Sequence, residues 1–346
     1  MREAVVSLGK IGFEVELLAP RGKSRRDLAE ALAENVGGSV ERIFYPQGEP
    51  SKADHTPFFE NLTLGFEVRD RRGDLLVKLV DDLTLQQDLD REAAPRPGWY
   101  RIVSDDRRLL RLIDQNTLAS APLERVLLPI AELFGSELER GPGGMLRLAD
   151  EAGNPVAIGA PLPGERERPC EVITAPIEAN HQERIESILS TARVLGFTIP
   201  AEGANHIHFD AAPLERSAAT AKLIRLLDEW GPALRERYCT NPACVRLGPW
   251  DEGVVKLAND PAFARLPWEE ARAQLMKQPL SKYCDFNISN YIRQLPQKRT
   301  FEVRILPVWL KAEKLVSAAA DFSRILSWAS DPQTDGGPLP SLESLL

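Results

Sequence analysis

The stretch GFEVEL, at residues 12–17, alternates apolar residues with glutamates, and NHIHFD at 205–210 and TFEVRI at 300–305 repeat the alternation with other ionisable groups. A β-strand sends successive side chains to opposite faces of its sheet. Each stretch therefore predicts a strand with one apolar and one ionisable face. If the three strands lie in one sheet with a common apolar side, their ionisable side chains line a single polar trough.

This trough would bring together carboxylates, imidazoles and one guanidinium. The side chains concerned are those of Glu14 and Glu16, of His206, His208 and Asp210, and of Glu302 and Arg304. Neighbouring carboxylates repel one another unless a cation or a proton neutralises them, and Mg²⁺ prefers oxygen ligands. Taken alone, the first stretch could be a solvated strand face, the second a polar strand end with hydrogen-bonded imidazoles, and the third a cross-strand ion pair. The combination indicates a site for a divalent metal and a phosphate.

The composition favours a soluble protein without a nucleic-acid partner. The chain has 346 residues, a net charge of −8 and a pI of about 5.3, whereas nucleic-acid binding needs a concentrated basic face. No run approaches the roughly 20 apolar residues of a membrane span, and the first residues lack the apolar stretch of a signal peptide. We therefore expect a cytoplasmic protein with no membrane partner. Four cysteines are too few for a disulfide framework in a chain of this length.

Strands joined by helices are predicted along the whole chain. Apolar residues at helical spacing indicate helices over 21–36, 122–138, 177–195, 213–230 and 311–328, and Ser24 can cap the first of them. The polar strands lie near both ends and in the middle of the sequence. We therefore predict an α+β fold with one catalytic domain over residues 1–330, loop insertions near 141–169 and 238–280, and a flexible tail over 331–346.

Five motifs in this order resemble the signatures of the putative amidoligase family. They are GFEVEL at 12–17, CEVITAPI at 170–177, NHIHFD at 205–210, Tyr283 with Asn287, and TFEVR at 300–304. That family belongs to the carboxylate–amine ligase superfamily, with glutamate–cysteine ligase and glutamine synthetase. The resemblance runs from residue 12 to about residue 307 and implies a curved, mainly antiparallel sheet with a concave catalytic face and helices on the other face, as in glutamine synthetase.

The resemblance also implies roles for individual residues. ATP would bind with two or three magnesium ions, and Arg304 would contact the transferred phosphate, so that Arg304 and Glu302 are the predicted catalytic residues. The implied metal ligands are Glu14, Glu16, Glu171, Glu302 and a histidine of the pair His206 and His208. The stretch VKLVDDLT at 77–84 is similar to a family strand that ends in Asp-x-Ser, which assigns Asp82 and Thr84 to the substrate site.

Other residues are weaker candidates. Lys282 and Asn287 are expected to line the nucleotide site, and Asp210 to line the substrate site. Arg246 could bind a substrate carboxylate or be an ordinary surface arginine. The two remaining histidines, His55 and His181, are expected at the surface.

The activity implied is that of an ATP- and magnesium-dependent ligase, which joins a small-molecule or peptide carboxylate to an amine through an acyl phosphate. Two alternatives stay open. A metal-dependent hydrolase could use the His-x-His strand, but it would need further histidines, and none follows His208. A non-catalytic binding protein could use a degenerate ligase fold, but it would have no need for mutually repelling carboxylates.

Overall fold

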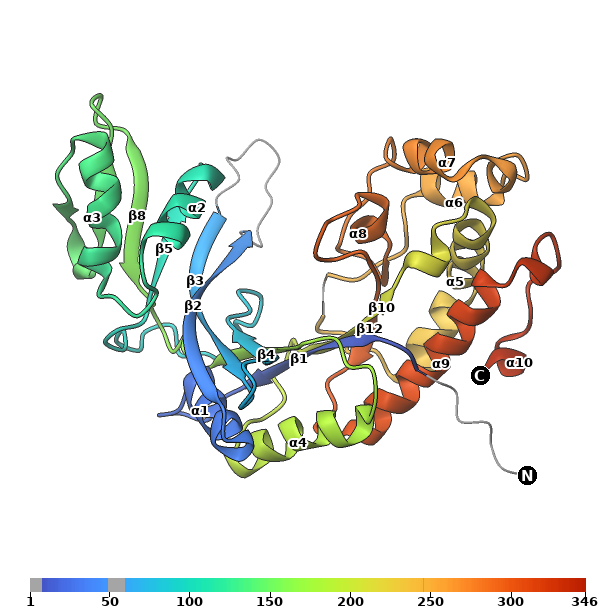
Figure 1. The fold of residues 1–346 in the computed structure, drawn as a ribbon, viewed down its shortest axis with the longest axis horizontal. Coiled ribbons are helices and arrows are strands. Elements are labelled where there is room, and N and C mark those ends of the chain that lie inside the picture. The colour runs from blue at the N-terminus through green and yellow to red at the C-terminus, as the bar shows by residue number, and fades with distance from the viewer. Residues whose placement is uncertain (1–7, 49–59, 245) are drawn as a thin grey trace. The chain divides into compact units, whose positions relative to one another are not determined.

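The computed structural model describes residues 8–48, 60–244 and 246–346, and it divides into two compact units. The described chain is α+β, with mainly antiparallel strand pairing and ten α-helices (Figure 1). Strand β1 (Ile11–Leu18) begins in the first unit and ends in the second. The α+β class and the antiparallel pairing are thus confirmed. The division into one catalytic domain and a flexible tail stays a prediction.

The first unit comprises Met1–Val15, Pro176–Ser190 and Glu202–Leu346. Its strands run in the order β11, β12, β10 and β1, and every pair is antiparallel. Beside the start of β1 and most of α4 (His181–Val194), its elements are β10 (Ala204–Asp210), α5 (Ser217–Tyr238), α6 (Glu252–Asn259), α7 (Trp268–Leu275), β11 (Phe286–Asn287), α8 (Ser289–Ile292), β12 (Thr300–Pro307), α9 (Ala312–Ser330), α10 (Leu342–Leu345) and the 3₁₀ turns Ala212–Leu214, Phe263–Arg265 and Pro332–Thr334.

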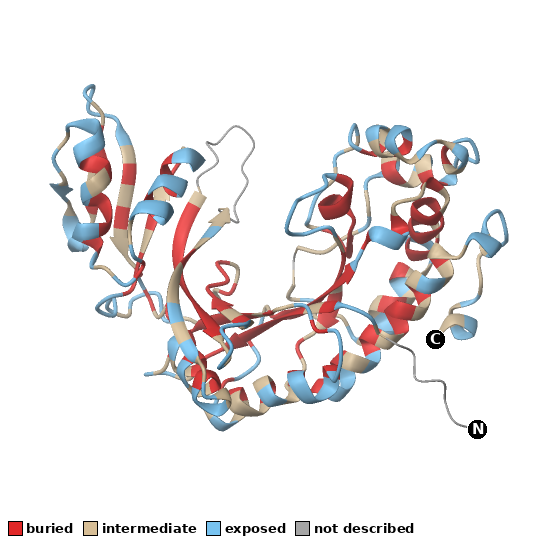
Figure 2. Ribbon diagram, in the orientation of Figure 1, coloured by how far each residue is buried: buried red, intermediate tan, exposed pale blue. Residues whose placement is uncertain are grey.

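The three alternating stretches pair with one another in this sheet. Phe13 lies opposite Ile207, and Ile207 lies opposite Val303. All three side chains are fully buried, and the strands that carry them are buried along most of their length (Figure 2). The predicted strands and their common apolar face are therefore confirmed. A bulge interrupts the register between β10 and β12, where Asn205 pairs with Leu306.

Helices α5 and α9 pack against each other, and α5 also packs against β12 (Figure 1). The predicted end of α5 at residue 230 was wrong, because the helix continues through Pro232 to Tyr238 and buries Leu234. The expectation of a surface position for His181 was also wrong. Its Nε2 lies 3.0 Å from Gly9 O and 2.9 Å from Ile177 O, and the residue is 8% exposed. His55 lies outside the described residues.

The second unit comprises Glu16–Ala175 and Thr191–Ala201. Its strands run in the order β9, β4, β3, β5, β8, β7 and β6, and β2 pairs with β3. Its elements are α1 (Arg25–Val36), β2 (Ser39–Gly48), β3 (Glu60–Arg69), β4 (Leu75–Val80), β5 (Tyr100–Ser104), α2 (Arg107–Asn116), α3 (Leu123–Phe134), β6 (Glu139–Arg140), the 3₁₀ turn Pro142–Gly144, β7 (Leu146–Ala149), β8 (Pro155–Pro161) and β9 (Pro169–Thr174).

Helix α1 is fixed to the sheet of the second unit by a buried arginine. Arg25 is 0% exposed and donates hydrogen bonds to Leu64 O, Arg166 O and Pro169 O. Just before it, Ser24 begins the helix as predicted, and its N–H donates to Asp27 Oδ2 at 2.8 Å. The buried guanidinium therefore ties the helix to three backbone carbonyls, two of which lie just before and at the start of β9.

None of the helices in the described part of the chain combines the length and the apolar composition that a bilayer crossing requires.

Candidate functional site

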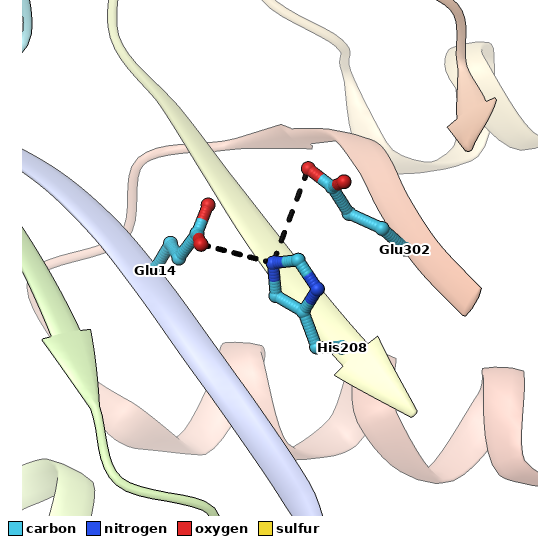
Figure 3. A group of neighbouring side chains, drawn as sticks. All are labelled: Glu14, His208 and Glu302. Atoms are coloured by element: carbon cyan, nitrogen blue, oxygen red, sulfur yellow. Dashed lines mark ion pairs between the residues drawn. The ribbon is translucent and has the colours of Figure 1, made fainter. Parts of the chain in front are cut away.

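Three strands of the first unit bring two carboxylates and two imidazoles together. Glu14 Oε2 lies 3.0 Å from His206 Nδ1, and Glu14 Oε1 lies 3.1 Å from His208 Nε2. Glu302 Oε1 lies 3.7 Å from His206 Nδ1 and 4.0 Å from His208 Nε2. Figure 3 shows the His208 ring between the two carboxylates, one from β1 and the other from β12. Residues near both ends of the sequence thus meet the middle strand, as the alternation predicts.

Polar neighbours fix the orientation of this cluster. Glu302 Oε1 accepts a hydrogen bond from Arg304 Nη1 at 2.5 Å, and Glu302 Oε2 accepts one from Asn287 Nδ2 at 2.8 Å. The other ring nitrogen of His208, Nδ1, lies 3.0 Å from Thr300 Oγ1. The glutamate and the imidazole are less than one tenth exposed. Both are therefore held by side chains from β11 and β12 rather than by water.

Two further residues of the site were not predicted from the sequence. Lys298 Nζ lies 3.5 Å from Glu14 Oε1, and Thr300 supports His208. The alternation could have found Thr300, because it shares a strand face with Glu302 and precedes it by two residues. The last strand is expected to begin at Lys298, two residues before Thr300, which would put Lys298 on the same face. The strand begins at Thr300 instead, and Lys298 lies in the turn before it, where the strand period does not fix the direction of a side chain.

The surrounding cations keep both carboxylates ionised. Burial by itself would raise the pKa of Glu14, but the charges of His208 and Lys298 outweigh it and hold that pKa well below its ordinary value. Burial would also raise the pKa of Glu302, but Arg304 and His208 lower it to about 2. Both carboxylates are therefore available as anionic ligands at neutral pH.

The two imidazoles titrate in opposite directions. Burial, reinforced by the charge of Arg304, lowers the pKa of His206. Burial also acts to lower the pKa of His208, but Glu14 and Glu302 outweigh it and raise that pKa above its ordinary value. His206 therefore favours the neutral form, and His208 holds a proton more firmly, in the metal-free cluster.

The donor set fits a divalent cation. Glu14, His208 and Glu302 each offer one ligand atom, and these atoms lie within 4.8 Å of one another in buried surroundings. Two of the three donors are carboxylates, which are the ligands that Mg²⁺ prefers, and Mg²⁺ commonly completes its shell with waters and phosphate oxygens. The cluster can therefore hold a hard cation that also binds a phosphate.

Four predicted site residues lie in the second unit. Glu16 is 5% exposed on β1, two residues beyond Glu14, and Glu171 lies on β9 opposite Val80. The Asp82 carboxylate accepts hydrogen bonds from the N–H and the hydroxyl of Thr84, at 2.8 and 3.0 Å. Asp82 and Thr84 thus form a turn immediately after β4. Their role in substrate binding stays a prediction, and so do the metal-binding roles of Glu16 and Glu171.

Three of the weaker candidates of the first unit make contacts outside the cluster, whereas Asn287 donates to Glu302 within it. Asp210, at the exposed end of β10, accepts a hydrogen bond from Ala212 N at 3.0 Å. The guanidinium of Arg246 and the ammonium of Lys282 lie 5.4 and 5.3 Å from the centre of the Tyr283 ring, respectively. These distances are those of cation–π contacts. The roles of Asp210, Arg246 and Lys282 in binding substrate or nucleotide stay predictions.

The chain was compared with known proteins. The model of a family described as "Putative amidoligase enzyme" matches residues 9–320. Searches of the curated proteins and of the solved structures found no significant match. The family match includes the strands β1, β10 and β12 that carry the buried cluster. On this evidence, the chain belongs to the amidoligase family.

Proposed function

We propose that the protein is an ATP- and magnesium-dependent carboxylate–amine ligase, which forms an amide or peptide-like bond. The observation that carries this proposal is the convergence of Glu14, His208 and Glu302 from three strands into one buried group. A ligase of this kind must bind ATP and neutralise its phosphates, and the cluster combines anionic metal ligands with a neighbouring arginine. Membership of the amidoligase family supports ligase activity in general.

The metal-binding part of the proposal divides the ligands into two sets. We propose that Glu14, His208 and Glu302, whose ligand atoms lie within 4.8 Å of one another, hold a first ion. His206, Glu16 and Glu171 are proposed as further ligands for a second or a third. Bound magnesium would neutralise and align the triphosphate of ATP. Asn287 and Thr300 hold Glu302 and His208 through hydrogen-bond contacts, so these two ligands of the first set are oriented before any ion binds.

Arg304 is the proposed phosphate-binding residue. Its Nη1 is bonded to Glu302 Oε1 at 2.5 Å, and its side chain is 11% exposed. A guanidinium is planar and presents several donors at once, so one N–H can stay on Glu302 while others bind phosphate oxygens. Arg304 would thus stabilise the negative charge of the transferring group where little water competes.

The proposed reaction has two steps. An oxygen of the carboxylate substrate attacks the γ-phosphorus of ATP, and ADP leaves with the electrons of the broken bond. The amine then attacks the acyl carbon, loses a proton, and displaces inorganic phosphate. Alignment and charge neutralisation supply most of the catalysis in such phosphoryl transfers. We further propose that the sheet has the concave catalytic face of glutamine synthetase, and that residues 141–169 and 238–280 select the two substrates.

The experiment is a phosphate-release assay with ATP and Mg²⁺, run on a matrix of small-molecule and peptide carboxylates and amines. Turnover that requires a carboxylate, an amine and Mg²⁺ together is the expected result, and mass spectrometry should find the amide. Glu302→Gln should abolish this turnover. Glu215→Gln is the control and should leave turnover intact, because Glu215 pairs with Arg299 outside the cluster. Zinc-dependent hydrolysis without ATP consumption would show that the protein is a metal-dependent hydrolase and not a ligase. Nucleotide binding without turnover on any pair would favour the non-catalytic reading.

A further inference from the structure

Lys298 places a flexible cation beside the carboxylate of Glu14. Its backbone N–H donates to Leu295 O at 3.0 Å, in the turn that precedes β12. Its Nζ lies 3.5 Å from Glu14 Oε1, and its side chain is 51% exposed, whereas that of Glu14 is 8% exposed. One member of this ion pair is therefore fixed in the sheet, and the other can extend into solvent.

The carboxylate that Lys298 contacts also belongs to the candidate metal site. Glu14 Oε1 lies 3.1 Å from His208 Nε2, and both residues belong to the group that offers three ligand atoms within 4.8 Å. A divalent cation in this group would stand close to an ammonium on the same carboxylate. Like charges repel more strongly in buried surroundings than in water, so metal binding and the Lys298–Glu14 ion pair oppose one another.

The two cations of the site differ in their freedom to respond. Arg304 is 11% exposed at its side chain and is fixed on Glu302. Lys298 carries a compact charge on a four-carbon stem with several rotatable bonds, and half of its side chain is exposed. An ammonium displaced from Glu14 would stay attached to the turn before β12, within reach of an anion that binds together with the metal.

We propose that Lys298 exchanges partners when the site is loaded. In the metal-free protein it pairs with Glu14, and in the loaded protein it binds the triphosphate of the metal–nucleotide complex. The inference rests on the proposed function, because the second partner is the nucleotide. Lys298 therefore opposes binding of the metal when no nucleotide is present, and it favours binding of the metal–nucleotide complex.

The test measures two dissociation constants of Lys298→Met by isothermal titration calorimetry. One is that of Mn²⁺ alone, and the other is that of adenylyl imidodiphosphate at saturating Mn²⁺. Removal of the competing ammonium should tighten Mn²⁺ binding by about twofold to fivefold, the range of a partly exposed ion pair. Removal of the phosphate contact should weaken binding of the analogue by about tenfold or more, since a hydrogen bond to a charged group is lost.

The matched control is Arg299→Gln, because Arg299 is the next residue and pairs with Glu215 instead. The exchange is supported if Lys298→Met binds Mn²⁺ more tightly and the nucleotide analogue more weakly than the wild type, while both dissociation constants of the control stay unchanged. Constants that are unchanged in Lys298→Met, or that shift in the same direction, overturn the exchange and leave the proposed function standing. Wild-type protein that binds Mn²⁺ but not the analogue overturns the proposed function and the exchange together. Lys298→Arg, which keeps the charge, should retain most of the affinity for the analogue, and a loss as large as that of Lys298→Met would also overturn the exchange.

Discussion

Asn287 donates a hydrogen bond from Nδ2 to Glu302 Oε2 at 2.8 Å, and its own Oδ1 accepts from the N–H and the hydroxyl of Ser289. The amide is 1% exposed, so no solvent replaces it. It occupies one oxygen of Glu302, and the other oxygen contacts Arg304 and the two histidines. A single amide thus sets the orientation of a candidate metal ligand.

Asn287→Leu should therefore destabilise the metal-free protein. The substitution leaves a buried carboxylate oxygen without its donor, which costs about 1–3 kcal/mol of the free energy of unfolding. Urea denaturation monitored by circular dichroism measures the loss. Asn290→Leu is the control, because its amide lies 3.4 Å from Thr300 Oγ1 and contributes a weaker bond. Equal losses in the two variants would contradict the role given to Asn287.

Arg304→Ala should lower kcat by a factor on the order of 10²–10³, the typical effect of removing one preorganised electrostatic contact. Arg304→Lys should recover only part of this, because a lysine keeps the charge but not the planar arrangement of donors. Steady-state phosphate release measures both variants. Unchanged kcat in Arg304→Lys would show that charge alone is needed, and unchanged kcat in Arg304→Ala would remove Arg304 from the reaction.

Divalent metal should stabilise the wild-type protein against heat. A ligand at one hundred times its Kd contributes about 2.7 kcal/mol when only the folded state binds it. Differential scanning fluorimetry with added Mg²⁺ or Mn²⁺ should therefore show a rise in Tm that is lost in Glu14→Gln and Glu302→Gln. Glu178→Gln is the control, since Glu178 pairs with Lys10 at the surface of the same unit. A full rise in both site variants would place the metal elsewhere.

The two site histidines should titrate in opposite senses in the metal-free protein. His208 has a pKa raised above 6.5 by Glu14 and Glu302, which outweigh burial. It therefore contributes stability below pH 6.5 that is lost as the pH rises through its folded-state pKa. His206 has a lowered pKa because of burial, so its contribution is present above pH 6.5 and is lost as the pH falls.

Imidazole NMR measures this directly, because the chain has only four histidines. The resonances of His206 and His208 can be assigned by their loss in His206→Gln and His208→Gln. The expected order is His206 below 6.5 and His208 above it. A reversed order would mean that the charges around the two rings differ from those described.

Loss of one partner of a buried ion pair should strongly destabilise the second unit. Arg166 pairs with Asp81, which is 0% exposed, and its Nη2 also donates to Asp82 O at 2.7 Å. Arg166→Met leaves the Asp81 charge buried without its partner, which costs about 3–5 kcal/mol. Chemical denaturation measures the change, and Arg108→Met, at an exposed pair with Asp106, should change stability far less, because exposed ion pairs contribute little.

The cluster was predictable because it follows from the period of a strand. Glu14, His208 and Glu302 each stand between apolar residues that must be buried, so one shared apolar face forces their side chains to the opposite face. The register was not predictable, and it decides the contacts. Gly12, not Glu14, lies opposite His208, and the bulge after Val303 breaks the regular pairing where Arg304 lies.

The remaining errors come from contacts that no local pattern encodes. His181 is buried because two backbone carbonyls accept its Nε2, and one of them belongs to Gly9, far away in the sequence. Helix α5 continues beyond Pro232 because Leu234 fills the core, so tertiary packing outweighs the missing backbone donor. Lys298 reaches the site from a turn, where the residue type alone does not predict which way the side chain points.

The strands of the site are far apart in the order of synthesis. Most of the second unit is encoded without interruption from Glu16 to Ala175, whereas β1 must wait for β10 and β12 to emerge before Glu14 acquires its partners. Contacts of such long sequence separation form late and slowly. A nascent chain can therefore assemble one unit first, and its candidate metal site is complete only when ribosomal elongation has passed Glu302.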